Sequence, residues 1–158
     1  MTRELINLSD YWIGFSNDTG SLITNLKLQK ILYYTQAWYL ALFNEPLFQD
    51  DFEAWVHGPV VRELYNEYKH FSWKPIEKDI NEQDFNSIRN NYNDKTQQFL
   101  QELADEYFTL DAYTLERLTH QEEPWIKARH GLSEDSPCDT IIQKDWMKDY
   151  YRQRIEHG

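Results

Sequence analysis

Apolar residues recur every three or four positions along most of the chain, which is the spacing of one helix face. The first predicted helix shows this spacing at Leu5, Leu8, Trp12 and Phe15. It ends within residues 17–20, because the glycine there favours the left-handed backbone conformation that closes many helices. The same spacing predicts helices over residues 25–43, 59–70, 111–120, 124–129 and 140–155, and one that begins after Asn81 or Asn93 and ends near Leu110.

Residues 25–43 form the one predicted helix that is apolar on nearly every face. Thr24 precedes it as a suitable N-cap, and Pro46 follows it, where the proline ring disfavours helical geometry in Glu45. A helix that is apolar all round is buried in a globular protein. We therefore expect residues 25–43 to form the centre of the fold.

Two charged residues, Lys27 and Lys30, interrupt this apolar helix. Each ammonium group must reach solvent along its aliphatic stem or meet a carboxylate, because an unpaired buried charge is costly. Glu53 and Glu123 are the candidate partners. Such a pairing would hold the segments around these glutamates against the central helix.

Residues 47–57 alternate loosely between apolar and polar positions, which predicts a short strand that Gly58 and Pro59 end. Residues 73–78 are a candidate partner strand, although Pro75 confines such a strand to a sheet edge. The predicted fold is therefore mainly α. It is a compact single domain over residues 1–158, with about seven helices around a buried central helix and a minor two-stranded β element.

The amino-acid composition indicates which class of partner molecule the protein is suited to bind. Asp and Glu number 27 against 16 Lys and Arg, which gives a formal net charge of −11. Phosphate affinity comes from Lys and Arg, so binding to nucleic acid is disfavoured and a basic partner is favoured. Aromatic residues make up 16% of the chain, which excludes intrinsic disorder and supplies large side chains for a core or an interface.

Targeting signals are missing from the sequence. The longest stretch without a charged residue, residues 31–44, is shorter than the roughly 20 residues that a membrane span takes. Cys138 is the single cysteine and cannot form an internal disulfide, and the N-terminus lacks the apolar segment of a signal peptide. We therefore expect a cytoplasmic protein.

The five histidines raise the question of a metal site. His120 and Glu122, followed by Pro137 and Cys138, resemble half of the zinc deaminase signature, but position 141 holds Ile141 in place of the second cysteine. No two histidines have the four-residue spacing of a helix-borne metal site. We therefore predict no metal and no cofactor.

Cys138 is also a candidate nucleophile, with His130 as its base. No third group orients this pair, and a lone cysteine usually serves as a small apolar side chain. A glycine-rich phosphate loop is missing as well. We therefore predict no catalytic residues and no enzymatic activity.

Two short segments combine aromatic, ionisable and helix-breaking residues. In the first, Trp55 and His57 stand beside Gly58 and Pro59 at a predicted helix entrance, where free backbone N–H groups attract an acidic group. A structural turn is the simpler interpretation of this segment.

The second segment covers residues 118–125 and contains His120. Glu123 stands just before Pro124, where it is placed to cap the next helix while Trp125 packs inward. A structural role is again the simpler interpretation.

Taken together, these segments resemble the Panacea domain family, also called the SocA-like antitoxin or phage-associated GepA-like family. The resemblance covers residues 5–155 and rests on several ordered blocks, any one of which would be weak alone. The blocks are LKLQKILYY at residues 26–34, AWYLALF at 37–43, PLF at 46–48, EAWVHGPVV at 53–61, LERLTH at 115–120, EPW at 123–125 and AR at 128–129.

The resemblance implies a mainly helical antitoxin of a bacterial or phage toxin–antitoxin system. Such proteins neutralise a cognate protein toxin by direct binding, and the toxin is usually encoded by the neighbouring gene. The SocA type instead delivers its toxin to a cellular protease, so a proteolytic adaptor, or a phage-associated accessory protein, is the alternative. Many relatives carry a fused DNA-binding module, and we expect none here, because the domain begins near Met1 and one cysteine cannot build a zinc ribbon.

Among the matching positions, aromatic and charged residues are the candidates for contact with the toxin, because such residues anchor many interfaces. They are Trp55, His57, Arg62, Tyr65 and Trp125. The residues that we predict to be structural are Lys27, Lys30, Glu53, Gly58, Pro59, His120, Glu123 and Pro124.

Overall fold

The computed structural model describes residues 1–157 and is mainly α, as the sequence predicted, with 63% of the chain in helices. The helices are α1 (Arg3–Thr19), α2 (Asn25–Phe43), α3 (Arg62–Tyr68), α4 (Glu82–Asn90), α5 (Asp94–Leu103), α6 (Ala112–His120), α7 (Glu123–Ala128) and α8 (Lys144–His157). A 3-10 turn, η1 (Lys69–Phe71), follows α3, and a π-helical segment, η2 (Ala104–Phe108), extends α5.

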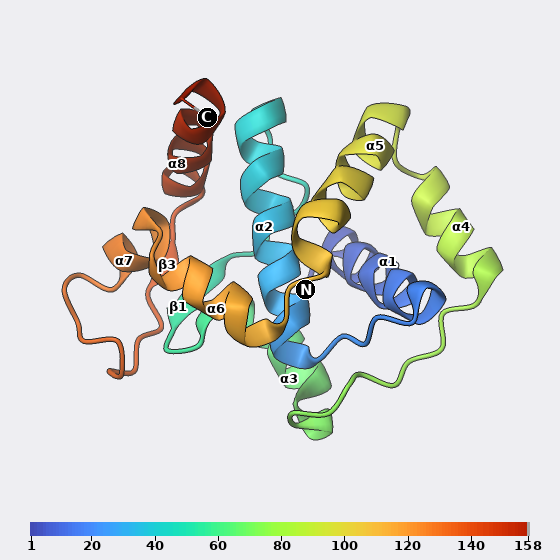
Figure 1. Ribbon diagram of the computed structural model, residues 1–158, viewed down its shortest axis with the longest axis horizontal. Coiled ribbons are helices and arrows are strands. Elements are labelled where there is room, and N and C mark those ends of the chain that lie inside the picture. Colours follow the sequence, from blue (N-terminus) through green and yellow to red (C-terminus); the bar gives the residue numbers. More distant parts are fainter. Residues whose placement is uncertain (158) are drawn as a thin grey trace.

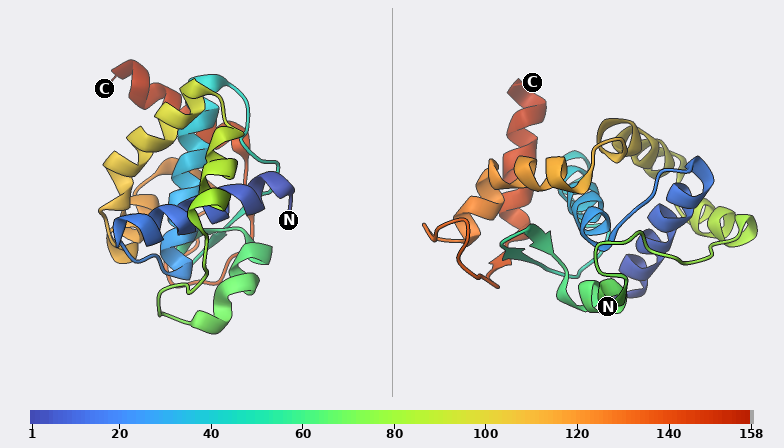
Figure 2. Two further views of the ribbon diagram at one scale, coloured as in Figure 1. Left: turned by 90° about the vertical axis from the view of Figure 1, so that its right-hand side faces the viewer. Right: turned by 60° about the horizontal axis from the view of Figure 1, so that its bottom comes forward.

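Three short strands form an antiparallel sheet in the order β2-β1-β3. They are β1 (Phe52–Trp55), β2 (Gly58–Val60) and β3 (Ile141–Ile142). The minor β element thus has one strand more than the sequence predicted. The sheet lies at one end of the molecule and α4 at the other (Figures 1 and 2).

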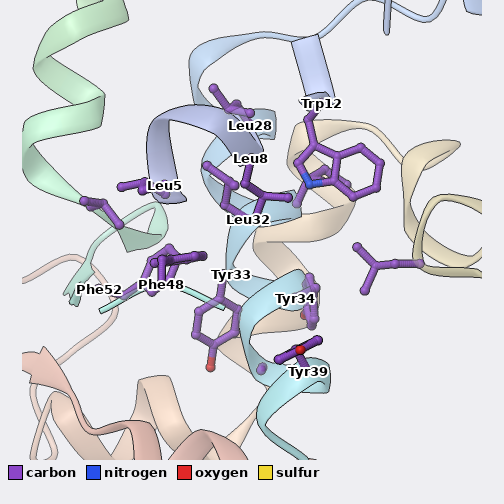
Figure 3. Close-up of a cluster of buried hydrophobic side chains, with 14 of the residues drawn as sticks. Leu5, Leu8, Trp12, Leu28, Leu32, Tyr33, Tyr34, Tyr39, Phe48 and Phe52 are labelled. Atoms are coloured by element: carbon purple, nitrogen blue, oxygen red, sulfur yellow. The ribbon is translucent and has the colours of Figure 1, made fainter. Parts of the chain in front are cut away.

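Helix α2 forms the centre, as predicted. It is buried along most of its length and contacts α8 on one side and α5 on another, while α1 crosses it (Figures 1 and 2). Thr24 caps its first turn by accepting a hydrogen bond from the Lys27 amide at 3.2 Å, and Asn44 closes its end in the left-handed conformation. Its apolar side chains meet those of α1 and of the segment before β1 in one continuous core (Figure 3).

Two glutamines inside α2 position the chain around the sheet. The side-chain amide of Gln36 accepts a hydrogen bond from the Leu47 amide at 2.8 Å and donates one to the Phe48 carbonyl at 2.6 Å. Gln29 accepts from the Val61 amide at 2.9 Å and donates to the Val61 carbonyl at 3.5 Å. Buried backbone groups outside regular structure need such partners, so α2 determines where the chain enters β1 and leaves β2.

Two predicted helix starts were wrong, for the same physical reason. Gly58–Val60 belong to β2 and not to the first turn of a helix, so α3 begins at Arg62. Ile141–Ile142 pair with β1 as β3, so α8 begins at Lys144 and not at residue 140. In both places the segment forms backbone hydrogen bonds with β1 when it is a strand. As part of a helix it would not form these interstrand hydrogen bonds.

The predicted pairing of residues 73–78 with the first strand was also wrong. The Ile76 amide donates to the Ile23 carbonyl at 2.9 Å, and Thr24 and Pro75 form an isolated bridge. Both Asn81 and Asn93 cap a helix, so the region that was predicted as one helix holds α4 and α5. The described residues therefore contain eight α-helices, against about seven predicted.

We predict that Gln36→Met destabilises the fold by about 2–4 kcal/mol, because it keeps the side-chain length but leaves the Leu47 amide and the Phe48 carbonyl without partners. Urea unfolding followed by circular dichroism measures the change. Gln83→Met on an exposed face of α4 is the matched control and should shift stability by less than about 0.5 kcal/mol. Equal effects of the two substitutions would contradict this role of Gln36.

Candidate functional site

A surface pocket with a volume of about 470 Å³ lies beside the β1–β2 hairpin. Residues 55–57 of the hairpin form one wall, Arg62 at the start of α3 forms another, and residues 137–139 close it. The pocket therefore joins segments that are far apart in the sequence. We call it the hairpin pocket.

The hairpin that carries this pocket is tight. Trp55 pairs with Gly58, so only Val56 and His57 form the turn. Gly58 has φ of +104°, and a Cβ atom at this position would lie 2.6 Å from Lys30 Cε and 3.0 Å from Thr119 Oγ1. Only glycine allows this conformation and this close approach to α2. The geometry of the hairpin therefore requires glycine at position 58.

Trp55 lies at the centre of a polar and aromatic group on the outside of the hairpin. Its indole N–H donates to Glu53 at 3.0 Å, its ring meets Tyr65 edge to face at 5.0 Å, and the Arg62 guanidinium lies 5.0 Å from the ring centre. Arg62 also donates two hydrogen bonds to Glu53, at 2.8 and 3.2 Å. Burial opposes ionisation of Glu53, but these hydrogen bonds outweigh it and hold the pKa of the carboxyl below its usual value.

His57, at the tip of the hairpin, faces α6. Its Nδ1 atom lies 2.6 Å from Glu116 Oε1, while 65% of its side chain remains exposed. This pair joins the turn to α6 and leaves much of the imidazole ring accessible. His57 therefore presents one face to solvent at the rim of the hairpin pocket.

Buried side chains hold β1 from behind. Trp125 donates its indole N–H to the Trp55 carbonyl at 2.8 Å, and Arg129 donates to the Ala54 carbonyl at 2.7 Å. The Arg129 guanidinium also stacks on the Trp125 ring at 4.7 Å, and His120 stacks on the same ring at 4.1 Å. The group around Trp55 on the outside of the hairpin is thus backed by the buried side chains of Trp125 and Arg129.

The two lysines of α2 do not pair with Glu53 or Glu123, so that prediction was wrong. Lys27 donates to the Phe108 carbonyl at 2.6 Å, and burial lowers its pKa against the opposing charge of Asp111. Lys30 is 1% exposed and its ammonium nitrogen has no hydrogen-bond partner. Burial lowers the pKa of Lys30 to about 7, although the charge of Glu116 opposes this shift.

The buried carboxylate of the second segment is Glu122 and not Glu123. Glu122 accepts hydrogen bonds from the hydroxyls of Tyr34 at 2.8 Å and Tyr151 at 2.6 Å. Burial raises its pKa, and the two hydrogen bonds oppose the shift. Glu123 is exposed in the first turn of α7, followed by the buried Pro124. Glu122 thereby connects α2, α7 and α8.

Three of the five predicted contact residues, Trp55, His57 and Arg62, line the hairpin pocket, and a fourth, Tyr65, packs against Trp55. The fifth, Trp125, is 3% exposed and supports the hairpin from inside, so it offers little surface to a partner. Pro59 lies on β2, which is an edge strand, and pairs with Ala54 of β1. Proline has no backbone N–H to donate, and an edge strand tolerates this because one of its sides has no partner strand.

Sequence reasoning missed Gln29, Gln36, Glu122 and Arg129, whose side chains bind parts of the chain distant in sequence. A signal was present for the glutamines, because polar residues on an otherwise apolar helix must find partners inside the fold. Arg129 gave no such signal, since a basic residue just after a helix usually lies on the surface.

The part of the chain that the structure describes contains no candidate metal site and no candidate membrane-spanning helix. Within residues 1–157 no three His, Cys, Asp or Glu side chains come together as a metal site. None of the helices in this range has the length and apolar character that crossing a membrane requires.

The family model of the SocA-like antitoxin, Panacea domain, matches residues 28–126. The chain belongs to this family. The matched range contains the hairpin, its support at Trp125, the three predicted contact residues that line the hairpin pocket, and Tyr65 beside Trp55. Residues 137–139, which close the pocket, lie outside it. Neither the curated proteins nor the solved structures gave a match.

The buried Lys30 gives this Panacea domain a predicted pH dependence. Its folded pKa, about 7, lies below its ordinary value of 10.5, so between these values the unfolded chain binds one more proton. The cost of burying the charge is therefore complete below pH 7 and decreases as the pH rises. We expect Lys30→Met to stabilise the protein by about 1–4 kcal/mol at pH 6 and by clearly less at pH 9.

Urea unfolding at a series of pH values measures this difference. Lys95→Met, at an exposed position of α5, is the control and should change stability by less than about 0.5 kcal/mol at every pH. A stability difference between Lys30→Met and the parent protein that does not vary with pH would contradict the titration of Lys30.

Proposed function

We propose that this Panacea domain is an antitoxin that neutralises a cognate protein toxin by direct binding, and that the hairpin pocket is part of the contact surface. Family membership supports a protein toxin as the partner in general. The observation that carries the proposal is the group of half-buried Trp55 and Glu53 with exposed Arg62, beside a hairpin that buried side chains support.

This group has the composition of an interface anchor. Tryptophan, tyrosine and arginine dominate binding energy in many interfaces, because each covers a large area at low conformational cost. Trp55 and Tyr65 are both half-buried, so their rings are already held before a partner arrives. A surface that is ordered in advance loses less entropy on binding.

The charge of the chain favours a basic toxin. The net charge of −11 attracts such a partner at long range and raises the rate of encounter. At short range, Asp139 lines the hairpin pocket and Glu116 lies beside His57. We propose that the toxin is inhibited because its active surface is covered, with no bond made or broken by side chains of this chain.

Co-expression with the product of the neighbouring gene tests the proposal. We expect that product alone to stop growth, the parent chain to restore it, and the two proteins to purify as a complex. The double variant His57→Glu/Arg62→Glu should weaken the complex at least about 10-fold, because it removes the Arg62–Glu53 pair and adds like charges beside Glu53 and Glu116.

The matched control is Lys69→Glu/His70→Glu on the exposed turn η1, which makes a similar charge change away from the pocket and should leave neutralisation intact. A harmless neighbouring product, or one that stays lethal beside the parent chain, would contradict the antitoxin proposal. Toxin levels in a host that lacks its cytoplasmic proteases distinguish the alternative, because an adaptor loses its effect there and a direct inhibitor does not.

A further inference from the structure

A second concave surface is lined by residues of the C-terminal half of α2 and of the α5–η2 segment, and none of them lines the hairpin pocket. Figure 1 shows these two helical segments. The concave surface consists of two hollows of about 270 and 280 Å³ that share Leu42, Phe99 and Glu102. We call it the aromatic groove. The residues along its apolar surface are Trp38, Leu42, Phe43, Phe99, Leu103 and Tyr107.

The groove exposes apolar surface on the helix that is otherwise the most buried. Leu42 is 50% exposed, although most neighbouring residues of α2 are buried. Trp38 is half-buried and donates its indole N–H to the Tyr107 hydroxyl at 2.7 Å, which joins the two sides of the groove at its base. Apolar surface gathered in a groove, unlike a single exposed leucine, is typical of a binding site.

The π-helical segment η2 shapes this groove. Such segments occur often at functional sites, because the wider turn changes the direction of its side chains. Here Tyr107 stacks on Tyr34 of α2 with ring centres 4.3 Å apart, and burial raises its pKa to about 12. Glu106, the preceding residue, lines the groove and is exposed.

One side of the groove is acidic. Glu102 and Glu106 both line it, and within the described residues neither has a Lys, Arg or His nitrogen within 4.0 Å. Like charges four residues apart on a helix destabilise it slightly. Lys95 lines one of the two hollows, and the charge of Arg154 is close enough to Tyr107 to oppose the rise of its pKa. The groove therefore places the two carboxylates beside the exposed Leu42 and the half-buried Trp38.

We propose that the aromatic groove is a second protein-docking surface, and that its occupant is an amphipathic helix with an apolar stripe flanked by Lys or Arg. The apolar stripe would cover Leu42 and Trp38, and the flanking cations would pair with Glu102 and Glu106. Helix binding in an apolar groove is a common recognition mode, in which anchors recur every three or four residues. This inference goes beyond the proposed function, since it does not require the occupant to be the toxin.

A second copy of the chain is a poorer match for the same groove. The formal charge of −11 on each copy makes their association unfavourable at long range. In a symmetric pair built on this groove, the acidic sides would also approach each other. A basic helix relieves the repulsion between Glu102 and Glu106, whereas an acidic copy adds to it.

The test uses the purified full chain and a synthetic peptide of about 18 residues, with Leu on one helical face and Lys elsewhere, labelled for fluorescence anisotropy. A peptide with Glu in place of every Lys is the first control. We expect the Lys peptide to bind at least about 10-fold more tightly than the Glu peptide. Leu42→Gln and Glu102→Lys/Glu106→Lys should each weaken binding of the Lys peptide by at least about 10-fold.

Two matched variants separate the groove from general charge attraction. Leu22→Gln changes a leucine that is 70% exposed outside the groove, and Glu77→Lys/Asp79→Lys reverses two exposed carboxylates in the loop before α4. Both should leave the affinity within about 2-fold of the parent value. Thermal melts of all four variants establish that each is folded at the temperature of the titration.

Equal weakening by the groove variants and their controls would overturn the proposal, because the peptide would then follow net charge alone. A dimer of the parent chain in sedimentation equilibrium that Leu42→Gln abolishes would also overturn it, since a second copy would then occupy the groove. The titration contains no toxin, so its failure leaves the antitoxin proposal standing.

Discussion

The fold depends on one constraint, which is that α2 lies in the interior with polar side chains on it. Buried polar groups need hydrogen-bond partners, and a helix already uses its own backbone groups. Gln29 and Gln36 therefore bind the backbone of Val61, Leu47 and Phe48. These bonds fix both ends of the chain segment that contains β1, β2 and the turn between them.

The candidate surfaces follow from this arrangement, because α2 lies next to both. In the N-terminal half of α2, Lys30 lies so close to Gly58 that the hairpin packs directly against the helix. At its C-terminal half, Trp38 and Leu42 reach the surface between α2 and α5. The hairpin pocket and the aromatic groove are thus separate surfaces: α2 supports the first from behind through the hairpin and lines the second with its own side chains.

Two ionisable side chains, Lys30 and Glu122, lie in the interior of this fold. Lys30 has no hydrogen-bond partner, and Glu122 is held by two tyrosine hydroxyls. Burial lowers the pKa of Lys30 and raises the pKa of Glu122, because it disfavours the charged form of each group. The stability of the domain is therefore linked to pH through residues that lie behind the hairpin pocket and do not line it.

The sequence alone determined the mainly α class, the central place of residues 25–43, and the caps at Thr24, Asn81, Asn93 and Asp111, because periodicity and capping act within a few residues. Three of the residues that it singled out as candidates for partner contact, Trp55, His57 and Arg62, line the hairpin pocket. Only the tertiary structure decided that residues 58–60 and 141–142 form strands, because their hydrogen-bond partners lie on β1. The burial of Glu122 in place of Glu123 was decided in the same way, since neighbouring residues of the same type differ only in which of them faces the interior once the helices pack.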